Sequence, residues 1–268
     1  MLASAAMPDP FRIVRAPPGL IWRALDGDQV VGAVSALLRP NGRWFVHFDL
    51  CQDDSYEALL AAVADNTDSD VYTAVDERNK DGLALFERLG FKVVRRERIV
   101  AIPTDPEVTG LHVTDEPDGV IVISANDAFE DQLRLLDDAL RQDVPGTEEW
   151  QWDPADFNEE TFGSDFDPAT YLVAVDVPSG EYIGLVRVWI NPGRPRLGLV
   201  AVLPPYRRRG LASLLLARAF RVLHERGKKE VTAEVDETNA ASSALLAKLG
   251  ARSIGGSVEL IRPRQASG

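Results

Sequence analysis

The clearest candidate for chemistry is the stretch from Val202 to Ala212, which reads Val-Leu-Pro-Pro-Tyr-Arg-Arg-Arg-Gly-Leu-Ala. A β-rich run over residues 197–202 ends at two prolines, which cannot continue a strand. Three arginines and Gly210 follow, and an apolar helix is expected directly after them. Glycine lets backbone amides approach a ligand closely, and a helix N-terminus attracts anions through its unpaired amides and its dipole. The stretch therefore predicts a phosphate-binding turn between a strand and a helix.

The spacing Arg207-x-x-Gly210-x-Ala212 resembles the Q/R-x-x-G-x-G/A loop of the GCN5-related N-acetyltransferases, the GNAT family. The resemblance implies that acetyl-coenzyme A is the cosubstrate and that backbone amides of the loop hold its pyrophosphate. The residues concerned are Arg207, Arg208, Arg209, Gly210, Leu211 and Ala212. It also implies that backbone groups of Ala201 and Val202 pair with the pantetheine arm and polarise the thioester carbonyl. Asn239 would hydrogen-bond the same arm, although its residue type equally suits a helix N-cap.

A repeat supports the resemblance and sets the architecture. Val75-Asp76-Glu77-Arg78-Asn79 and Val235-Asp236-Glu237-Thr238-Asn239 lie 160 residues apart, and the alignment continues without a gap to two Leu-Gly pairs. Eight of the seventeen aligned positions are identical. Both copies read as a strand, an Asn turn, an amphipathic helix and a glycine cap. They are similar to the V-x-x-x-N … L-G-F segment of the GNAT family, so two GNAT-like halves are expected.

The predicted fold class is α/β (α+β), with two tandem GNAT-like domains. Each would be a mixed, mostly antiparallel twisted sheet flanked by helices. The first domain is expected over residues 11–104, with a closing strand at 91–102, and a linker rich in Pro, Asp and Gly covers 105–119. The second domain is expected over 120–264, with its last strand at 257–261. The first half is too short for the two helices with which the family usually begins, so it reads as truncated.

The first half has also lost the phosphate loop. When the two cofactor helices are aligned, Gln52-Asp53-Asp54-Ser55-Tyr56-Glu57 stands against Arg207 to Ala212. Carboxylates at this position would repel phosphates. The first half is therefore predicted to be a degenerate domain that does not bind coenzyme A.

Transfer of acetyl to an amine requires the neutral amine, because the protonated nitrogen has no lone pair. A lysine-like amine with a pKa near 10.4 is only about 0.1% neutral at pH 7.5, so a general base is expected. Many GNAT enzymes use a glutamate near the start of the strand before the phosphate loop, where this chain has Arg196. Another subset places the glutamate in the strand before the conserved Asn. Ala233-Glu234-Val235-Asp236 resembles that pattern, which makes Glu234 the candidate catalytic base.

The repeat helps to choose between carboxylates. Asp236 is a weaker alternative base, because Asp76 repeats it in the half that is expected to be inactive. Ala74 stands at the position of Glu234 in that half, so only the second half has this carboxylate. The family's usual acid, a tyrosine seven residues after the Asn, is Leu246 here. A thiolate leaving group with a pKa near 8.5 needs protonation much less than an alkoxide does.

The segment 143–167 is the predicted border of the acceptor groove. It carries nine carboxylates and no Lys or Arg, with Trp150, Trp152, Phe157, Phe162 and Phe166 between them. The carboxylates are Asp143, Glu148, Glu149, Asp153, Asp156, Glu159, Glu160, Asp165 and Asp167. Carboxylates and aromatic faces suit a cationic amine, but the same pattern also fits a surface helix whose aromatics face the core.

Composition narrows the partners. The net charge of −13, from 29 basic and 42 acidic residues, disfavours nucleic-acid binding and favours a cationic substrate. No apolar run is long enough for a membrane span, and the three histidines show no metal spacing. A single cysteine, Cys51, suits a reducing cytoplasm. Whether the chain forms a homodimer is left open by the sequence.

The sequence thus predicts an N-acetyltransferase that moves acetyl from acetyl-coenzyme A to a primary amine of a small cationic acceptor, aminoglycoside-like or polyamine-like. Two alternatives stay open. One is a protein lysine or N-terminal acetyltransferase, and the other is an acetyl-coenzyme A-binding regulator without turnover.

Overall fold

A computed structural model describes residues 11–16, 19–67, 69–191 and 193–264. The chain folds into two compact units. The first unit comprises Met1–Arg95 with Ser257–Gly268, and the second comprises Arg96–Gly256.

In the first unit the strands are ordered β1-β2-β3-β4-β5-β12. Their bounds are β1 (Arg12–Ala16), β2 (Ile21–Asp26), β3 (Gln29–Leu38), β4 (Trp44–Asp49), β5 (Val71–Asp76) and β12 (Arg252–Arg262). Helices α1 (Ser55–Ala64) and α2 (Lys80–Arg88) cover one face, where Leu59, Leu60 and Phe86 are buried in the core of this unit. Of the strand pairs, β4 with β5 is parallel.

In the second unit the order is β6-β11-β10-β9-β8-β7. The strands are β6 (Lys92–Pro103), β7 (Val120–Ser124), β8 (Tyr171–Asp176), β9 (Glu181–Trp189), β10 (Arg196–Val202) and β11 (Glu230–Asp236). The helices are α3 (Pro106–Thr109), α4 (Glu130–Arg141), α5 (Pro154–Thr161), α6 (Leu211–Glu225) and α7 (Ala240–Lys248). Here β10 runs parallel to β11, whereas β7, β8, β9 and β10 pair antiparallel with one another.

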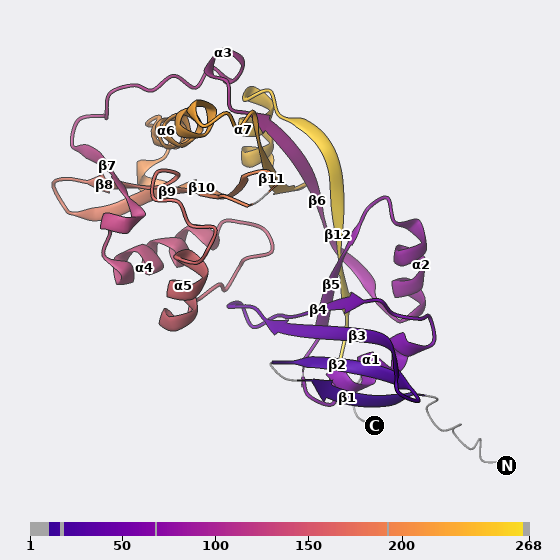
Figure 1. Cartoon of the computed structure of the whole chain (residues 1–268). Coiled ribbons are helices and arrows are strands. Elements are labelled where there is room, and N and C mark those ends of the chain that lie inside the picture. The colour runs from indigo at the N-terminus through magenta and orange to yellow at the C-terminus, as the bar shows by residue number, and fades with distance from the viewer. Residues whose placement is uncertain (1–10, 17–18, 68, 192, 265–268) are drawn as a thin grey trace, which may run out of the picture. The chain divides into compact units, whose positions relative to one another are not determined.

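Helices cover both faces of the second sheet. Figure 1 shows α6 and α7 on one face and α4 and α5 on the other. Successive residues of β9 show why, because alternate side chains of a strand point to opposite faces. Leu185 is buried in the core beneath α4 and α5, and its neighbour Val186 is buried in the core beneath α6. This arrangement confirms the predicted class, a mixed and mostly antiparallel sheet flanked by helices.

The expected assignment of the closing strands is wrong, because the two halves exchange them. The strand expected to close the first half is β6, and its residues from Arg96 onward pair with β11 of the second unit, with Val231 opposite Ile102. The strand expected to complete the second half is β12, and its residues from Ser257 onward pair with β5 of the first unit. The compact units therefore do not follow the expected ranges 11–104 and 120–264.

Strand length and burial explain the exchange. At about 3.3 Å per residue, the 12-residue strand β6 is long enough to leave one unit and continue in the other. Ile102 is fully buried in the core of the second unit, and Val258 of β12 is fully buried in the core of the first. Each half therefore completes the core of the other.

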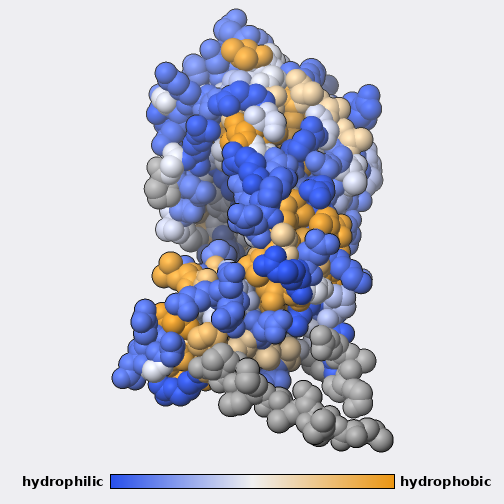
Figure 2. Space-filling view, turned by 90° about the vertical axis from the view of Figure 1, so that its right-hand side faces the viewer, coloured by the Kyte–Doolittle hydropathy of each residue, from blue (hydrophilic) through white to orange (hydrophobic). Residues whose placement is uncertain are grey.

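The surface is mostly polar in the view of Figure 2, where apolar side chains occur in separate groups. Among the described residues, no helix combines the length and the apolar character that a membrane crossing requires.

Candidate active site

The parallel strands β10 and β11 pair only briefly. Their ladder consists of two residue pairs, Arg196 with Thr232 and Leu197 with Ala233. On its other edge, β10 stays paired with β9 as far as Val202. From Leu199 onward, the edge of β10 that faces β11 therefore has no ladder in the described structure, and its backbone groups can bond a ligand. We call this opening the fork; its closed end is the pair Leu197–Ala233.

A β-bulge marks the closed end of the fork. The register between β10 and β9 shifts between Leu197 and Leu199, which places Gly198 in the bulge. A Cβ atom on Gly198 would lie 2.1 Å from ring atom Cζ3 of Trp189. The indole ring thus packs directly on the backbone, and only glycine leaves room for it.

The loop at the open end has the geometry expected of an anion site. Arg208 (φ 64°) and Gly210 (φ 81°) both adopt left-handed conformations, which non-glycine residues seldom do. Gly210 is the N-cap of α6 and supplies no capping side chain, so the first amides of the helix keep their hydrogen-bonding capacity. Strained backbone beside uncapped helix amides is typical of a ligand-binding loop.

The side chain of Arg207 anchors this loop. Its Nε donates a 2.8 Å hydrogen bond to the carbonyl oxygen of Val202, and its Nη2 is ion-paired with Asp143. The carbonyl of Val202, which was expected to face the pantetheine arm, is thus engaged by the loop, and Ala201 precedes it on the open stretch of β10. Arg208 and Arg209 are exposed and directly precede Gly210. The loop therefore combines a fixed backbone with two accessible cations.

Glu234 lies close to the closed end of the fork and is paired with Arg196. Nη2 of Arg196 donates a 2.5 Å hydrogen bond to Oε2 of Glu234, and each side chain is 38% exposed. Thr232 lies opposite Arg196 in the ladder, and Glu234, two residues further on, shares its face of the sheet. The structure thus brings together the candidate base and the arginine at the family's more usual base position.

Other predicted residues have structural roles. Oδ1 of Asn239 accepts a 3.0 Å hydrogen bond from the amide of Ser242, so Asn239 is an N-cap of α7. Asp236 accepts a 2.7 Å hydrogen bond from the amide of Thr238, which builds the turn before that helix. Leu246 is buried in the core and offers no proton. These contacts favour Glu234 over Asp236 as the base.

In the acidic segment the aromatic side chains face inward. Phe157 is fully buried, and Trp150 and Trp152 pack edge to face with ring centroids 5.2 Å apart. The guanidinium carbon of Arg141 already lies 4.6 Å from the centre of the Trp150 ring. The core alternative therefore holds for these rings. Some carboxylates of the segment have structural partners, because Asp153 caps α5 and Asp167 is paired with Arg226. Others, namely Asp156, Glu159 and Glu160, are exposed.

Sequence reasoning missed a buried ionic cluster beneath α4. Asp137, fully buried, accepts hydrogen bonds from Nε of Arg141 at 2.5 Å and Nε1 of Trp152 at 2.8 Å. Arg187 of β9 is 2% exposed, and its Nη2 lies 3.6 Å from Oδ2 of Asp137. Burial raises the pKa of Asp137, but the two guanidiniums and the hydrogen bonds outweigh it, so its pKa is lowered. The signal in the sequence was an arginine inside the apolar run of β9.

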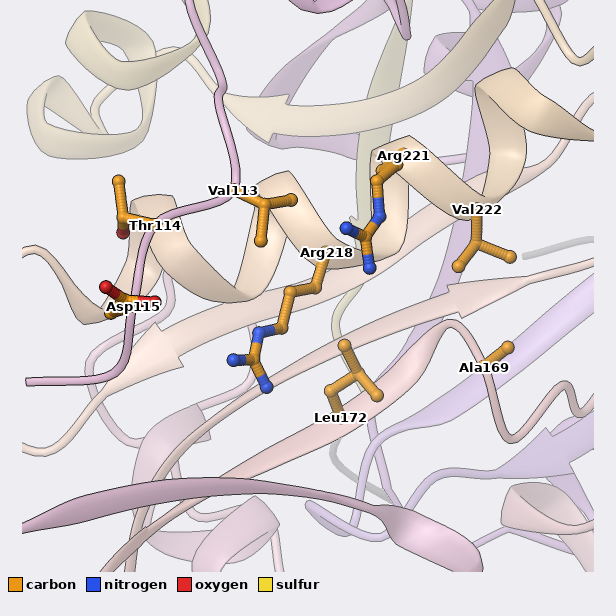
Figure 3. Close-up of a pocket in the computed structure, with 8 residues that line it drawn as sticks. All are labelled: Val113, Thr114, Asp115, Ala169, Leu172, Arg218, Arg221 and Val222. Atoms are coloured by element: carbon orange, nitrogen blue, oxygen red, sulfur yellow. The ribbon is translucent and has the colours of Figure 1, made fainter.

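A separate pocket of about 570 Å³ lies beside α6. Figure 3 shows Arg218 and Arg221 coming from α6, with Leu172 of β8 and the segment from Val113 to Asp115 around them. Nη1 of Arg218 donates a 3.0 Å hydrogen bond to Glu116. None of the lining residues comes from β10 or β11, so this pocket is distinct from the fork.

The first unit retains a fork but not the loop. β4 and β5 share only the pairs Trp44–Val71 and Phe45–Tyr72. At the following helix, Asp53, Asp54 and Glu57 line a pocket of about 790 Å³. The carboxylates predicted from the alignment therefore stand at the start of α1.

Fork, bulge and arginine–glycine loop occur together in one unit, and they lie within residues 133–251, which match the Acetyltransferase (GNAT) family. This part of the chain is therefore similar to the GNAT family. The match covers less than half of the chain and contains α5 to α7 and β8 to β11, with most of α4.

Relatives extend the comparison. The chain is 32% identical over 163 residues to the mycothiol acetyltransferase of Salinispora tropica, which covers 58% of this chain and 52% of that protein. The chain thus spans about half the length of this curated relative. A GCN5-related N-acetyltransferase from Sphaerobacter thermophilus has a TM-score of 0.68 at 19% identity, covering 92% of this chain and 82% of that one. A tandem GNAT protein from the clavulanic acid biosynthesis pathway has a TM-score of 0.65 at 19% identity, covering 95% of this chain and 86% of that one. These two likenesses concern the fold of the GNAT proteins.

Proposed function

We propose that the second unit transfers acetyl from acetyl-coenzyme A to a primary amine of a small cationic acceptor. The observation that carries the proposal is the fork, which opens from Leu197 and Ala233 toward the loop at Arg207. An arm bound along β10 would place its phosphates at the amides before α6 and its thioester near Glu234. The stretch from Leu197 to Val202 is about 17 Å long at about 3.3 Å per residue.

In the proposed reaction the neutral amine attacks the thioester carbonyl directly. The N–C bond forms, the C–S bond breaks, and the thiolate of coenzyme A leaves. Glu234 takes the proton that the nitrogen loses, directly or through a water molecule. Deprotonating a lysine-like amine at pH 7.5 costs about 4 kcal/mol. A base that accepts the proton can therefore lower the barrier by up to this amount. Because a thiolate leaves readily, Leu246 at the tyrosine position is compatible with turnover.

The acceptor is proposed to be cationic because of charge near the closed end of the fork. The amide of Ile190 donates a 2.9 Å hydrogen bond to the carbonyl oxygen of Asp165, so the end of the acidic segment lies beside the end of β9. Trp189, at that end, is opposite Arg196. Helix α5 carries the exposed carboxylates Asp156, Glu159 and Glu160. They add to the negative potential that attracts a polyamine or an aminoglycoside-like molecule.

We also propose that the first unit is a degenerate GNAT-like domain. Its support is the repeated fork together with Asp53 and Asp54 at the start of α1, which would repel phosphates. The proposal places the reaction in the cytoplasm, in keeping with a single cysteine in the chain.

The test begins with a calorimetric titration with acetyl-coenzyme A, for which one site per chain is expected. Release of free thiol is then followed with spermidine, an aminoglycoside and a peptide with a free N-terminus. Turnover with the small amines supports the proposal, and turnover with the peptide alone would show a protein acetyltransferase. If acetyl-coenzyme A binds but no amine causes release of free coenzyme A thiol, the protein is a regulator. If acetyl-coenzyme A does not bind, the whole proposal is refuted.

A further inference from the structure

Arg196 is held in place at the closed end of the fork. Its backbone pairs with Trp189 on one side and with Thr232 on the other. Its guanidinium donates to Oε2 of Glu234 at 2.5 Å and lies 5.0 Å from the centre of the Trp189 ring. A guanidinium over an indole face is a favourable cation–π arrangement. The arginine is therefore oriented by an aromatic platform while it binds the candidate base.

The platform is itself fixed from two directions. The ring of Trp189 packs on the backbone at Gly198, where a side chain would overlap it. The guanidinium of Arg187 lies 4.6 Å from the centre of the same ring, and Arg187 is anchored near Asp137 in the buried cluster. Trp189 and Arg187 are two residues apart on β9, so they share the face covered by α4 and α5. A continuous set of contacts thus runs from the buried cluster to Glu234.

We propose that Arg196, stacked on Trp189, is a positioning residue that holds the Glu234 carboxylate in place for proton transfer. The proposal rests on the proposed acetyltransferase function. Among the described residues, Glu234 accepts a hydrogen bond from Arg196 through Oε2, which leaves Oε1 for the amine. Exposed ion pairs contribute little to stability. Loss of the Arg196–Glu234 ion pair is therefore expected to lower kcat and to leave the melting temperature nearly unchanged.

The main test is Arg196→Gln in the full chain, with an amine that the wild-type protein acetylates. We expect kcat to fall about 10- to 100-fold, because misplacing a catalytic group by about 1 Å costs up to about 100-fold. The KM for acetyl-coenzyme A and the melting temperature are expected to stay near wild-type values. Arg196→Lys, which keeps a donor and the charge, should recover part of kcat. The matched control is Arg194→Gln, since Arg194 makes a comparable pair with Glu230 of β11, 3.6 Å away.

A double-mutant cycle separates positioning from other roles. If Arg196 acts through Glu234, Arg196→Gln should change kcat by less than about twofold in a Glu234→Gln background. Equal losses in both backgrounds would overturn the positioning role, and so would an unchanged kcat in the single variant. A wild-type protein that binds acetyl-coenzyme A but acetylates no amine would refute the proposed function and this proposal with it. Loss of kcat without rescue by lysine, together with a lower melting temperature, would indicate a structural role only.

Discussion

The chain contains two forks of the same design with different chemistry around them. In each unit a pair of parallel strands shares two residue pairs and then separates, β4 from β5 and β10 from β11. In each unit the second strand leads into a turn and a capped helix, α2 or α7. The backbone of the repeat is thus preserved, and the difference lies in the side chains placed on it.

The preserved side chains are those that build the turn. Asn79 and Asn239 both cap the following helix, accepting hydrogen bonds of 2.8 and 3.0 Å. Asp76 and Asp236 both accept the amide two residues later, at 2.8 and 2.7 Å. A residue that recurs in both forks with the same contact is explained by the fold. Repetition within one chain therefore separates structural polar residues from catalytic candidates.

The residues that differ are at the two ends of the forks. At the open end, arginines and Gly210 in one unit stand against Asp53 and Asp54 in the other. At the closed end of the first fork, Phe45 and Tyr72 stack with ring centroids 5.5 Å apart. The corresponding part of the second fork holds Arg196 and Glu234. The first unit thus lacks the arginine–glycine loop at the open end and has no counterpart of Arg196 or Glu234 at the closed end.

The largest effect is expected for Glu234→Gln, which removes a carboxylate that the first fork lacks, since Ala74 stands at the aligned position there. Loss of a general base costs about 10²- to 10⁴-fold in rate. The affinity for acetyl-coenzyme A should stay within about twofold, because the substitution is remote from the phosphate loop. Steady-state kinetics and calorimetry measure the two quantities. Glu237→Gln, an exposed neighbour in the turn, is the matched control. An unchanged rate would remove Glu234 as the base.

The strand exchange predicts that truncating a buried residue of β6 destabilises the second unit. Truncating a buried residue of β12 should destabilise the first unit. Ile102→Ala should lower the free energy of unfolding of the second unit by about 2–5 kcal/mol, since Ile102 is fully buried there. Leu260→Ala should affect the first unit by a similar amount, because Leu260 is 3% exposed in its core. Scanning calorimetry with acetyl-coenzyme A identifies the second unit, since only a ligand-binding unit is stabilised by the ligand. The reverse assignment of the two effects would contradict the exchange.

Sequence reasoning located the loop and the repeat because both are local. Arg207, Gly210 and Asn239 stand at fixed spacings within single strand–turn–helix segments, so their neighbours along the chain determine their setting. The exchange of β6 and β12 is not local. Both strands contain apolar residues that could complete either sheet, and only the packing of residues such as Ile102 decides between them.

The same limit applies to the closed end of the fork. The contact between Arg196 and Glu234 depends on the register between β10 and β11. These strands begin 34 residues apart in the sequence, at Arg196 and Glu230. The direction of the aromatic rings in the acidic segment was open for a similar reason. Trp150 and Phe157 have the same spacing whether they face a groove or a core, and the presence of Arg141 beneath them could not be derived from that spacing.

A smaller effect is expected for Arg207→Glu, which makes the second loop acidic like the first. The substitution removes the bond to the carbonyl of Val202 and places a second carboxylate beside Asp143. We expect the Kd for acetyl-coenzyme A to rise about 10- to 100-fold, or about 1.4–2.8 kcal/mol. Calorimetry provides the measurement. The matched control is Gln52→Glu at the aligned position of the first unit, which should leave both affinity and stoichiometry unchanged. A change in stoichiometry with the control would mean that the first fork binds the cosubstrate as well.

The smallest effect concerns a turn that the two forks share. The Arg78 side chain and amide hydrogen-bond Asp76 and lower its pKa to about 2. A lowered pKa in the folded state stabilises that state at pH values above the ordinary Asp pKa of about 3.9, and this contribution is lost as the pH falls through about 2. The melting temperatures of wild type and Asp76→Asn should therefore converge progressively between about pH 5 and pH 1. The difference is expected to be small, because the group is solvent-exposed and water screens its charge. Arg78→Gln removes the same partner and should reproduce the loss, whereas Glu77→Gln should not. A wild-type advantage that persists undiminished at about pH 1 would show that Asp76 acts through the shape of the turn and not through its charge.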